Sequence, residues 1–116
     1  KYHLEETREK IVKDINNLNV RNRIIELIIK KFHQLCERQR IKLLLVNIDI
    51  VSFPFLYTYC KKNNIPFLDL SNKLAEINQE RSLYFKIDPH YNPYAHKIIG
   101  ELVSEYLKRN YFKTML

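Results

Sequence analysis

Glycine is nearly absent from this sequence: Gly100 is the only one among 116 residues. Loops that bind phosphate groups or oxyanions usually need several glycines, because the backbone must approach the ligand closely. Neither a phosphate loop nor a dinucleotide-binding fingerprint can be drawn here. The sequence therefore excludes these nucleotide-binding classes, and any oxyanion hole must use other residues or lie outside this chain.

Cysteines and long apolar runs are also scarce. Cys36 and Cys60 are the only cysteines, and their spacing fits neither a metal site nor a disulfide framework. Each falls at an apolar position of an expected helix, so we expect both to be small core residues. No stretch reaches the length of a membrane span, and no signal peptide opens the sequence. Because Lys1 is not a natural start, we expect the chain to be a segment of a longer protein.

The net charge is +7, and the excess of basic residues lies in the first third of the chain. Residues 1–42 carry eleven Lys and Arg against six Asp and Glu, and the remainder is nearly balanced. A basic balance can indicate nucleic acid or another anionic partner. The charges alternate, however, and no run reaches five of one sign. We interpret the excess as solvated helix faces and do not expect nucleic acid as the partner.

The apolar pattern predicts alternating helices and strands. Residues 3–17 fit a first helix, and Asn22 can cap a second one of about 18 residues with one broad buried face. The near-continuous apolar run 41–48 is typical of a strand buried on both faces of a parallel sheet. The later elements are a short helix from Pro54, a strand at 65–70, a helix at 72–79 capped by Ser71, a loop at 80–91 and a helix from Pro93, capped by Asn92, to about Arg109.

This order predicts an α/β fold with parallel strands. Two strands are too few for a sheet that is covered on both faces. The chain therefore either pairs with another copy or forms the back half of a larger doubly wound domain, and we favour the second arrangement. In such sheets the active site gathers at the carboxyl ends of the strands. The segments 47–52, 69–71 and 80–91 would lie at or near that edge.

The segment around Asp88 and His90 carries the strongest chemical signal. Pro89 biases Asp88 toward an extended backbone, in which side chains at i and i+2 point the same way. Asp88 and His90 should therefore face one side, with Tyr91 turned away from them. A carboxylate beside an imidazole is the orienting pair of a hydrolase, in which the acid holds one ring nitrogen and the other nitrogen takes a proton. Asn92 then begins a helix that anchors the loop.

The pattern Asp-x-His-x-Asn at residues 88–92, followed by a small residue, His96 and an amphipathic terminal helix, resembles the last conserved block of SGNH/GDSL hydrolases. The strand at 41–48, the helix after it and the strand at 65–70 resemble the late elements of that family. The resemblance covers roughly residues 20–110, with residues 1–20 outside it. It implies that the chain is the C-terminal part of one flavodoxin-like three-layer α/β/α sandwich.

The resemblance further implies a Ser-His-Asp triad that acts on acyl esters such as acetyl esters. Asp88 and His90 would be the acid and base, with Asn92 and His96 in supporting positions and no cofactor or metal. The family's Gly-Asp-Ser, glycine and Gly-x-Asn-Asp blocks are absent from this sequence. Ala95 also stands where the family often has glycine. The nucleophile is therefore unknown from this chain, and we expect the serine upstream of Lys1.

Plainer interpretations remain open for each of these residues. Asp88 and His90 alone would suit a loop salt bridge, and with His96 they would suit a metal site, although the histidines lack the i, i+4 helical spacing. His96 suits packing against the loop better than chemistry. Ser52 follows the first strand, where a nucleophile can sit, but Val51 and Phe53 flank it without a glycine elbow.

Two functions from different classes compete. The first is an ester hydrolase or acyl-transferring relative that binds an acyl-ester substrate. The second is a non-catalytic, basic, helix-rich module that binds an acidic protein or nucleic acid. Contact between Asp88 and His90 at a strand end would favour the first. Exposed apolar surface on half of an open sheet would also favour self-association or pairing with a missing N-terminal half.

Overall fold

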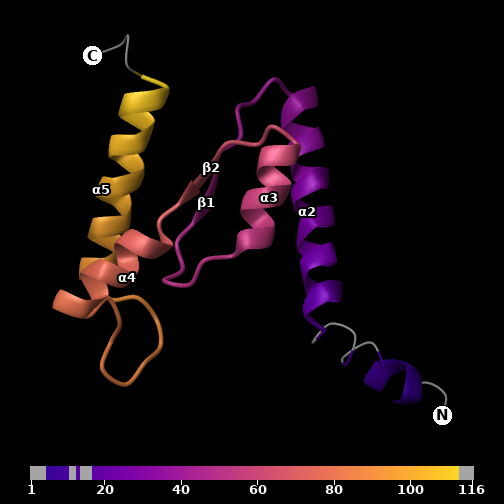
Figure 1. The fold of residues 1–116 in the computed structure, drawn as a ribbon, viewed down its shortest axis with the longest axis horizontal. Helices are drawn as coiled ribbons and strands as arrows, with labels where there is room; N and C mark the ends of the chain where they lie inside the picture. Colours follow the sequence, from indigo (N-terminus) through magenta and orange to yellow (C-terminus); the bar gives the residue numbers. More distant parts are fainter. Residues whose placement is uncertain (1–4, 11–12, 14–16, 113–116) are drawn as a thin grey trace. The chain divides into compact units, whose positions relative to one another are not determined.

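The computed structural model of the chain describes residues 5–10, 13 and 17–112 (Figure 1). Residues 5–10 are helical, and the rest of the expected helix at 3–17 lies largely outside the described residues. The fold is a mixture of helices with two parallel strands, as predicted. The named elements are α2 (Leu18–Arg38), β1 (Leu45–Asn47), α3 (Pro54–Lys62), β2 (Phe67–Asp69), α4 (Ser71–Glu80) and α5 (Pro93–Asn110).

Helix α2 begins five residues earlier than the sequence pattern predicted. Its N-cap is Asn17, whose side chain accepts a hydrogen bond from the Asn19 backbone N–H at 3.0 Å. Asn17 has extended backbone dihedrals, which leave its side chain free to satisfy an unpaired N–H of the first turn. The prediction that Asn22 is the cap was therefore wrong. Asparagines also stand at positions 16, 17 and 19, and all of them carry the capping chemistry, so the residue type alone did not identify the cap.

The ends of the other helices follow local sequence signals more closely. Pro54 is the first residue of α3, and Pro93 is the first residue of α5 behind its Asn92 cap, both as predicted. Helix α4 differs by one residue at its start. Leu70 occupies the N-cap position and Ser71 is already helical, so the predicted capping role of Ser71 was wrong.

Strands β1 and β2 form a two-stranded parallel sheet. Both strands are shorter than the apolar runs that predicted them. Leu45 N–H donates to the Pro66 carbonyl and Leu70 N–H donates to the Asn47 carbonyl, each at 3.0 Å. Each strand is three residues long, and no further strand among the described residues pairs with them.

The described chain separates into two compact units, which we treat one at a time. The first unit comprises residues 1–45 and 53–68, and α2 contacts α3 within it. Its core is formed by Ile29, Cys60 and Ile65. Cys60 is only 1% exposed, and this burial raises the pKa of its thiol, so the side chain stays neutral. Together with the burial of Cys36, this confirms that both cysteines are core residues.

One expectation about α2 was wrong. The apolar positions of this helix do not form one buried face: Ile29 and Cys36 are buried, but Ile28 is 63% and Phe32 55% exposed. The prediction treated a buried apolar face and an exposed apolar face as one buried face. Helical periodicity shows which side chains are apolar, but it does not show which of them pack against other residues.

The second unit comprises residues 46–52 and 69–116 and contains α4 and α5. Its buried apolar side chains are Leu70, Leu74, Leu83 and Ala95. Leu74, Leu83 and Ala95 are completely inaccessible to solvent. Leu83 lies directly before the loop that carries Asp88 and His90, so the core of this unit anchors one end of that loop. Within the described ranges, no helix is long and apolar enough to cross a membrane.

Replacement of Leu74 by alanine should lower the free energy of unfolding by about 2–5 kcal/mol, because a fully buried leucine leaves a cavity. Denaturant unfolding followed by circular dichroism measures the difference. Ile87→Ala is the matched control, since Ile87 is 99% exposed and its truncation should change stability by less than about 0.5 kcal/mol. Equal effects of the two substitutions would contradict this assignment of the core.

Candidate active site

A hairpin within the second unit presents Asp88 and His90. Tyr84 and Tyr91 form an isolated antiparallel bridge, and their rings stack with centroids 5.0 Å apart. Inside this bridge, the Phe85 N–H donates to the His90 carbonyl at 3.2 Å. The sequence predicted only a loop at 80–91. The stacked tyrosine pair closes it into a defined turn, because cross-strand aromatic pairs stabilise even a short ladder.

Asn92 holds the base of the hairpin and begins α5 at the same time. Its side-chain oxygen accepts the Ala95 N–H at 2.9 Å, while its side-chain amide donates to the carbonyls of Ser82 at 2.8 Å and Tyr84 at 3.2 Å. Its backbone N–H donates to the Leu83 carbonyl at 2.8 Å. One side chain therefore joins the chain entering the hairpin to the helix leaving it.

Asp88 and His90 lie together at the tip of this hairpin. The Asp88 Oδ1 atom accepts the His90 backbone N–H at 2.9 Å and is also in hydrogen-bond contact with His90 Nδ1. The two bonds fix the carboxylate and the imidazole in one local turn, which is the pairing expected from their i, i+2 spacing. Because a carboxylate only accepts hydrogen bonds, this contact requires Nδ1 to carry a proton, and in a neutral ring Nε2 is then the basic nitrogen.

The pair is open to solvent. The His90 side chain is 83% exposed and the Asp88 side chain 56% exposed. A polar pair this exposed contributes little to stability. The exposure also means that water screens the pair, and a reacting group would need additional protein around it to gain a low-dielectric environment.

Tyr91 fastens the hairpin to the chain that follows β1. Its hydroxyl donates to the Ile48 carbonyl, across 43 positions of sequence. Burial, with smaller contributions from Tyr84 and the nearby negative charge of Asp49, raises the pKa of the Tyr91 phenol. The hydroxyl therefore stays protonated and remains a donor over the ordinary pH range. This bond places the Asp88–His90 hairpin beside the carboxyl end of a strand, where active sites of α/β folds gather.

A second polar cluster organises the carboxyl ends of the strands themselves. The Asn47 side-chain amide donates to Asp69 Oδ1 and to the Val51 carbonyl, each at 3.0 Å. The Ser71 N–H donates to the same Asp69 oxygen at 3.0 Å. Burial works to raise the pKa of Asp69, but the hydrogen bonds from Ser71 and Asn47 outweigh it and hold the pKa below its usual value. Asp69 is therefore a charged structural clamp at neutral pH.

The contacts of the four serines show whether any of their hydroxyls lies beside His90. Ser71 is 1% exposed and starts α4, Ser82 exchanges hydrogen bonds with Tyr84, and Ser104 lies along α5. Ser52 is exposed after β1. No hydrogen bond between described residues joins any of these hydroxyls to His90.

His96 packs against the hairpin. Its ring meets the Tyr91 ring edge to face, with centroids 6.4 Å apart. This contact agrees with the packing role favoured from the sequence. Within the described portion, no group of three or more His, Cys, Asp or Glu side chains has the geometry of a metal site. The alternative in which Asp88, His90 and His96 share a metal therefore has no geometric support.

Two features of the site were not anticipated from the sequence. The first is the Tyr91 bond to Ile48, and the second is the Asn47–Asp69 contact across 22 positions. Both join segments that are distant in sequence. The only signal available was polar residues at the ends of two apolar runs, which marks an edge of a sheet but does not identify partners.

Comparison of the chain with protein families, with curated proteins and with solved structures gives no match. The functional argument therefore depends on the residues and the geometry of this chain.

Tyr91→Phe should loosen the hairpin while leaving its ring stack in place. Loss of the hydroxyl donor to Ile48 removes about 1 kcal/mol of local stability, which corresponds to roughly fivefold faster exchange of the Phe85 amide hydrogen. Hydrogen exchange followed by NMR measures this rate. Tyr94→Phe is the matched control, because the ring face under Arg81 is retained, and equal acceleration in both variants would contradict the anchoring role.

Proposed function

We propose that Asp88 and His90 are the acid and base of an ester hydrolase of the SGNH/GDSL type, or of an acyl-transferring relative, and that the substrate is an acyl ester. In this proposal the chain contributes the C-terminal part of a flavodoxin-like three-layer α/β/α domain. Two parallel strands with a helix between them in sequence are consistent with such a domain.

The observation that carries the proposal is the contact between His90 Nδ1 and Asp88 on an anchored hairpin. Asp-x-His turns can form by local geometry alone, but this one has three further attachments. Asn92 ties its base, Tyr84 and Tyr91 clamp its two arms, and the Tyr91 hydroxyl fixes it beside the end of β1. A catalytic base needs this kind of support, because small displacements of a proton acceptor reduce the rate steeply.

The chemistry follows from the protonation state that the contact requires. The Asp88 carboxylate holds the proton on Nδ1, so His90 Nε2 accepts the proton of the serine hydroxyl as its oxygen attacks the acyl carbonyl. The negative carboxylate stabilises the imidazolium that forms. When the tetrahedral intermediate collapses, His90 returns this proton to the leaving alcohol oxygen, and water or another hydroxyl then takes the acyl group from the serine.

The nucleophile and the oxyanion donors belong to another segment in this proposal. The sequence has no Gly-Asp-Ser block, and its single glycine lies on α5. The same segment would cover the exposed pair and exclude water from it, which would strengthen the attraction between the imidazolium and the carboxylate.

The protonation pattern of His90 can be measured on the chain itself. In the neutral ring, the Nδ1–H tautomer should predominate, because Asp88 accepts that proton. Long-range ¹H–¹⁵N NMR spectra distinguish the two tautomers. Asp88→Ala should shift the population toward Nε2–H, whereas Glu37→Ala, beside His33, should leave the His90 signals unchanged. A wild-type ring that is mainly Nε2–H would rule out the proposed orientation.

Ester turnover should require a Gly-Asp-Ser segment, which this sequence lacks, as well as His90. The 116-residue chain alone should neither hydrolyse p-nitrophenyl acetate through a serine nor become labelled by a serine-reactive phosphonate. In a longer chain carrying the Gly-Asp-Ser segment, His90→Ala should lower kcat/KM at least about thousandfold. His33→Ala on α2 is the control and should retain activity.

Two results would contradict this assignment in different ways. Wild-type turnover by the His90→Ala form of the longer chain would remove His90 from the mechanism. Stoichiometric labelling of Ser52 in the short chain, with turnover abolished by Ser52→Ala, would make this chain a complete hydrolase with a different nucleophile.

A further inference from the structure

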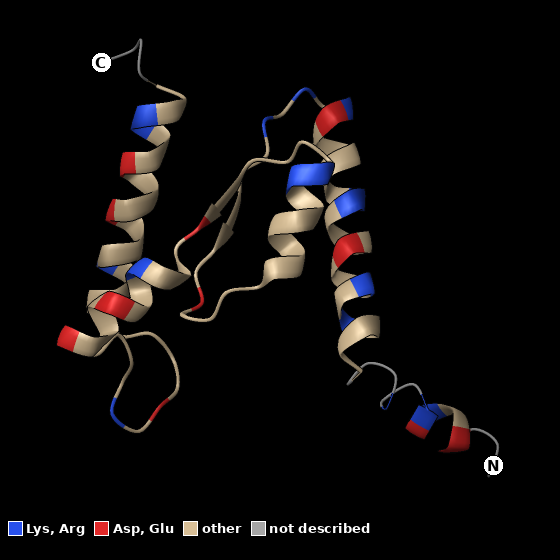
Figure 2. Ribbon diagram, in the orientation of Figure 1, with Lys and Arg blue, Asp and Glu red and all other residues tan. Residues whose placement is uncertain are grey.

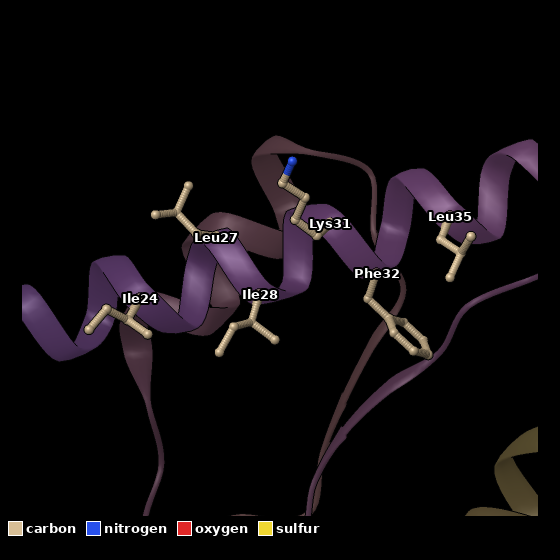
Figure 3. Close-up of a pocket in the computed structure, with 6 residues that line it drawn as sticks. All are labelled: Ile24, Leu27, Ile28, Lys31, Phe32 and Leu35. Carbon is tan, nitrogen blue, oxygen red and sulfur yellow. The ribbon is translucent and has the colours of Figure 1, made fainter.

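Helix α2 carries an apolar face that no other described residue of its own unit covers. Figure 3 shows its side chains projecting from the helix around a shallow groove that Lys31 also lines. The exposed fractions of the five apolar residues range from 39% to 63%. They are Ile24, Leu27, Ile28, Phe32 and Leu35, and we call them the α2 apolar face.

This face is separate from the side of α2 that builds the core. Ile29 is buried, and Ile25 packs against the same core cluster. At 3.6 residues per turn, Ile24, Ile28 and Leu35 form a stripe rotated away from that pair. The helix thus has one apolar side that stabilises its own unit and a second apolar side that does not.

The size of the α2 apolar face makes it an interaction surface. A large apolar side chain exposes roughly 200 Å² when free, so five of them at these fractions leave on the order of 500 Å². Patches of that size on soluble proteins usually mark binding sites. A stable interface buries about 800 Å² per partner around such an apolar centre. The face is one helix wide, which suits a partner helix laid along it.

Charge around the face decides which partner fits. Helix α2 carries five basic residues and two acidic ones, Glu26 and Glu37. Figure 2 shows these basic and acidic positions as blue and red bands along the helix. Both acids already have partners: Arg23 lies 3.5 Å from Glu26, and His33 lies 3.3 Å from Glu37. Lys30 and Lys31 make no ion pair with any described residue. Lys31 lines the α2 apolar face itself, which therefore presents one uncompensated positive charge, whereas Lys30 lines a separate groove with Glu26 and Lys62.

A second copy of the chain fits this charge poorly, because two α2 helices packed through the same face would bring two Lys31 side chains and no free carboxylate into one interface. A lipid surface could accommodate the apolar side chains but offers no carboxylate side chain on a helix of matching width. A helix with acidic flanks supplies apolar contacts and a carboxylate for Lys31 together.

We propose that the α2 apolar face docks an acidic amphipathic helix of a partner protein. The partner's apolar stripe packs on Ile28, Phe32 and their neighbours, and a flanking carboxylate pairs with Lys31. This surface lies on a different unit from Asp88 and His90, and the proposal does not depend on the ester hydrolase activity.

The test uses the full 116-residue chain and two synthetic peptides. Both peptides carry leucine at heptad positions a and d, and the flanking e and g positions are glutamate in one and lysine in the other. Fluorescence anisotropy should show binding of the glutamate peptide and at least tenfold weaker binding of the lysine peptide. Ile28→Glu should weaken binding of the glutamate peptide at least tenfold, and Lys31→Glu at least threefold.

Matched controls separate the face from general effects of charge. Ile87→Glu introduces the same residue at a fully exposed position, and Lys73→Glu makes the same charge reversal on α4. Both should bind the glutamate peptide as the unaltered chain does. Circular dichroism should show the same helix content in all four variants, because each substituted side chain is exposed.

Several results would overturn the proposal. One is absence of binding at peptide concentrations up to about 1 mM, and another is equal affinity for the two peptides. A dimer in sedimentation that Ile28→Glu converts to monomer would assign the face to a second copy. Sedimentation with phosphatidylserine vesicles that Ile28→Glu abolishes would assign it to a membrane surface.

Discussion

The hairpin at 84–91 depends on the side chain of Asn92. An asparagine side chain has one acceptor group and one donor group, and here the oxygen caps α5 while the amide binds two carbonyls of the incoming arm. Capping alone would accept Ser, Thr or Asp. None of these three has two side-chain N–H donors. The need to start a helix and to close a hairpin at the same position therefore accounts for asparagine, and the position of His90 follows from it.

The Asp88–His90 pair is well anchored yet poorly shielded. Its support comes from a buried leucine before the hairpin, a tyrosine clamp at the bridge and a helix cap after it. Its side chains nevertheless remain exposed to solvent. Anchoring comes from contacts within this unit, whereas exclusion of water from the pair would need further atoms around it, as the proposed hydrolase site requires.

Helix α2, in the first unit, likewise has one apolar side that is packed and another that is exposed. Ile29 takes part in a core with Cys60 and Ile65, and this side of the helix is explained by its own unit. The other side exposes Ile28 and Phe32, which a monomeric surface helix would normally replace with polar residues. Both the hairpin and the helix thus combine residues packed within their own unit with residues that are exposed to solvent.

The sequence by itself determined the elements that depend on neighbouring residues. Pro54 and Pro93 begin helices, Asn92 caps α5, and Asp88 meets His90 two positions away, because these outcomes need only local backbone geometry. Tertiary structure alone decided that Tyr91 binds Ile48, that Asn47 binds Asp69 and which side of α2 is buried. Those contacts depend on the path of the chain between distant positions, and an apolar or polar pattern does not specify which distant partner each side chain meets.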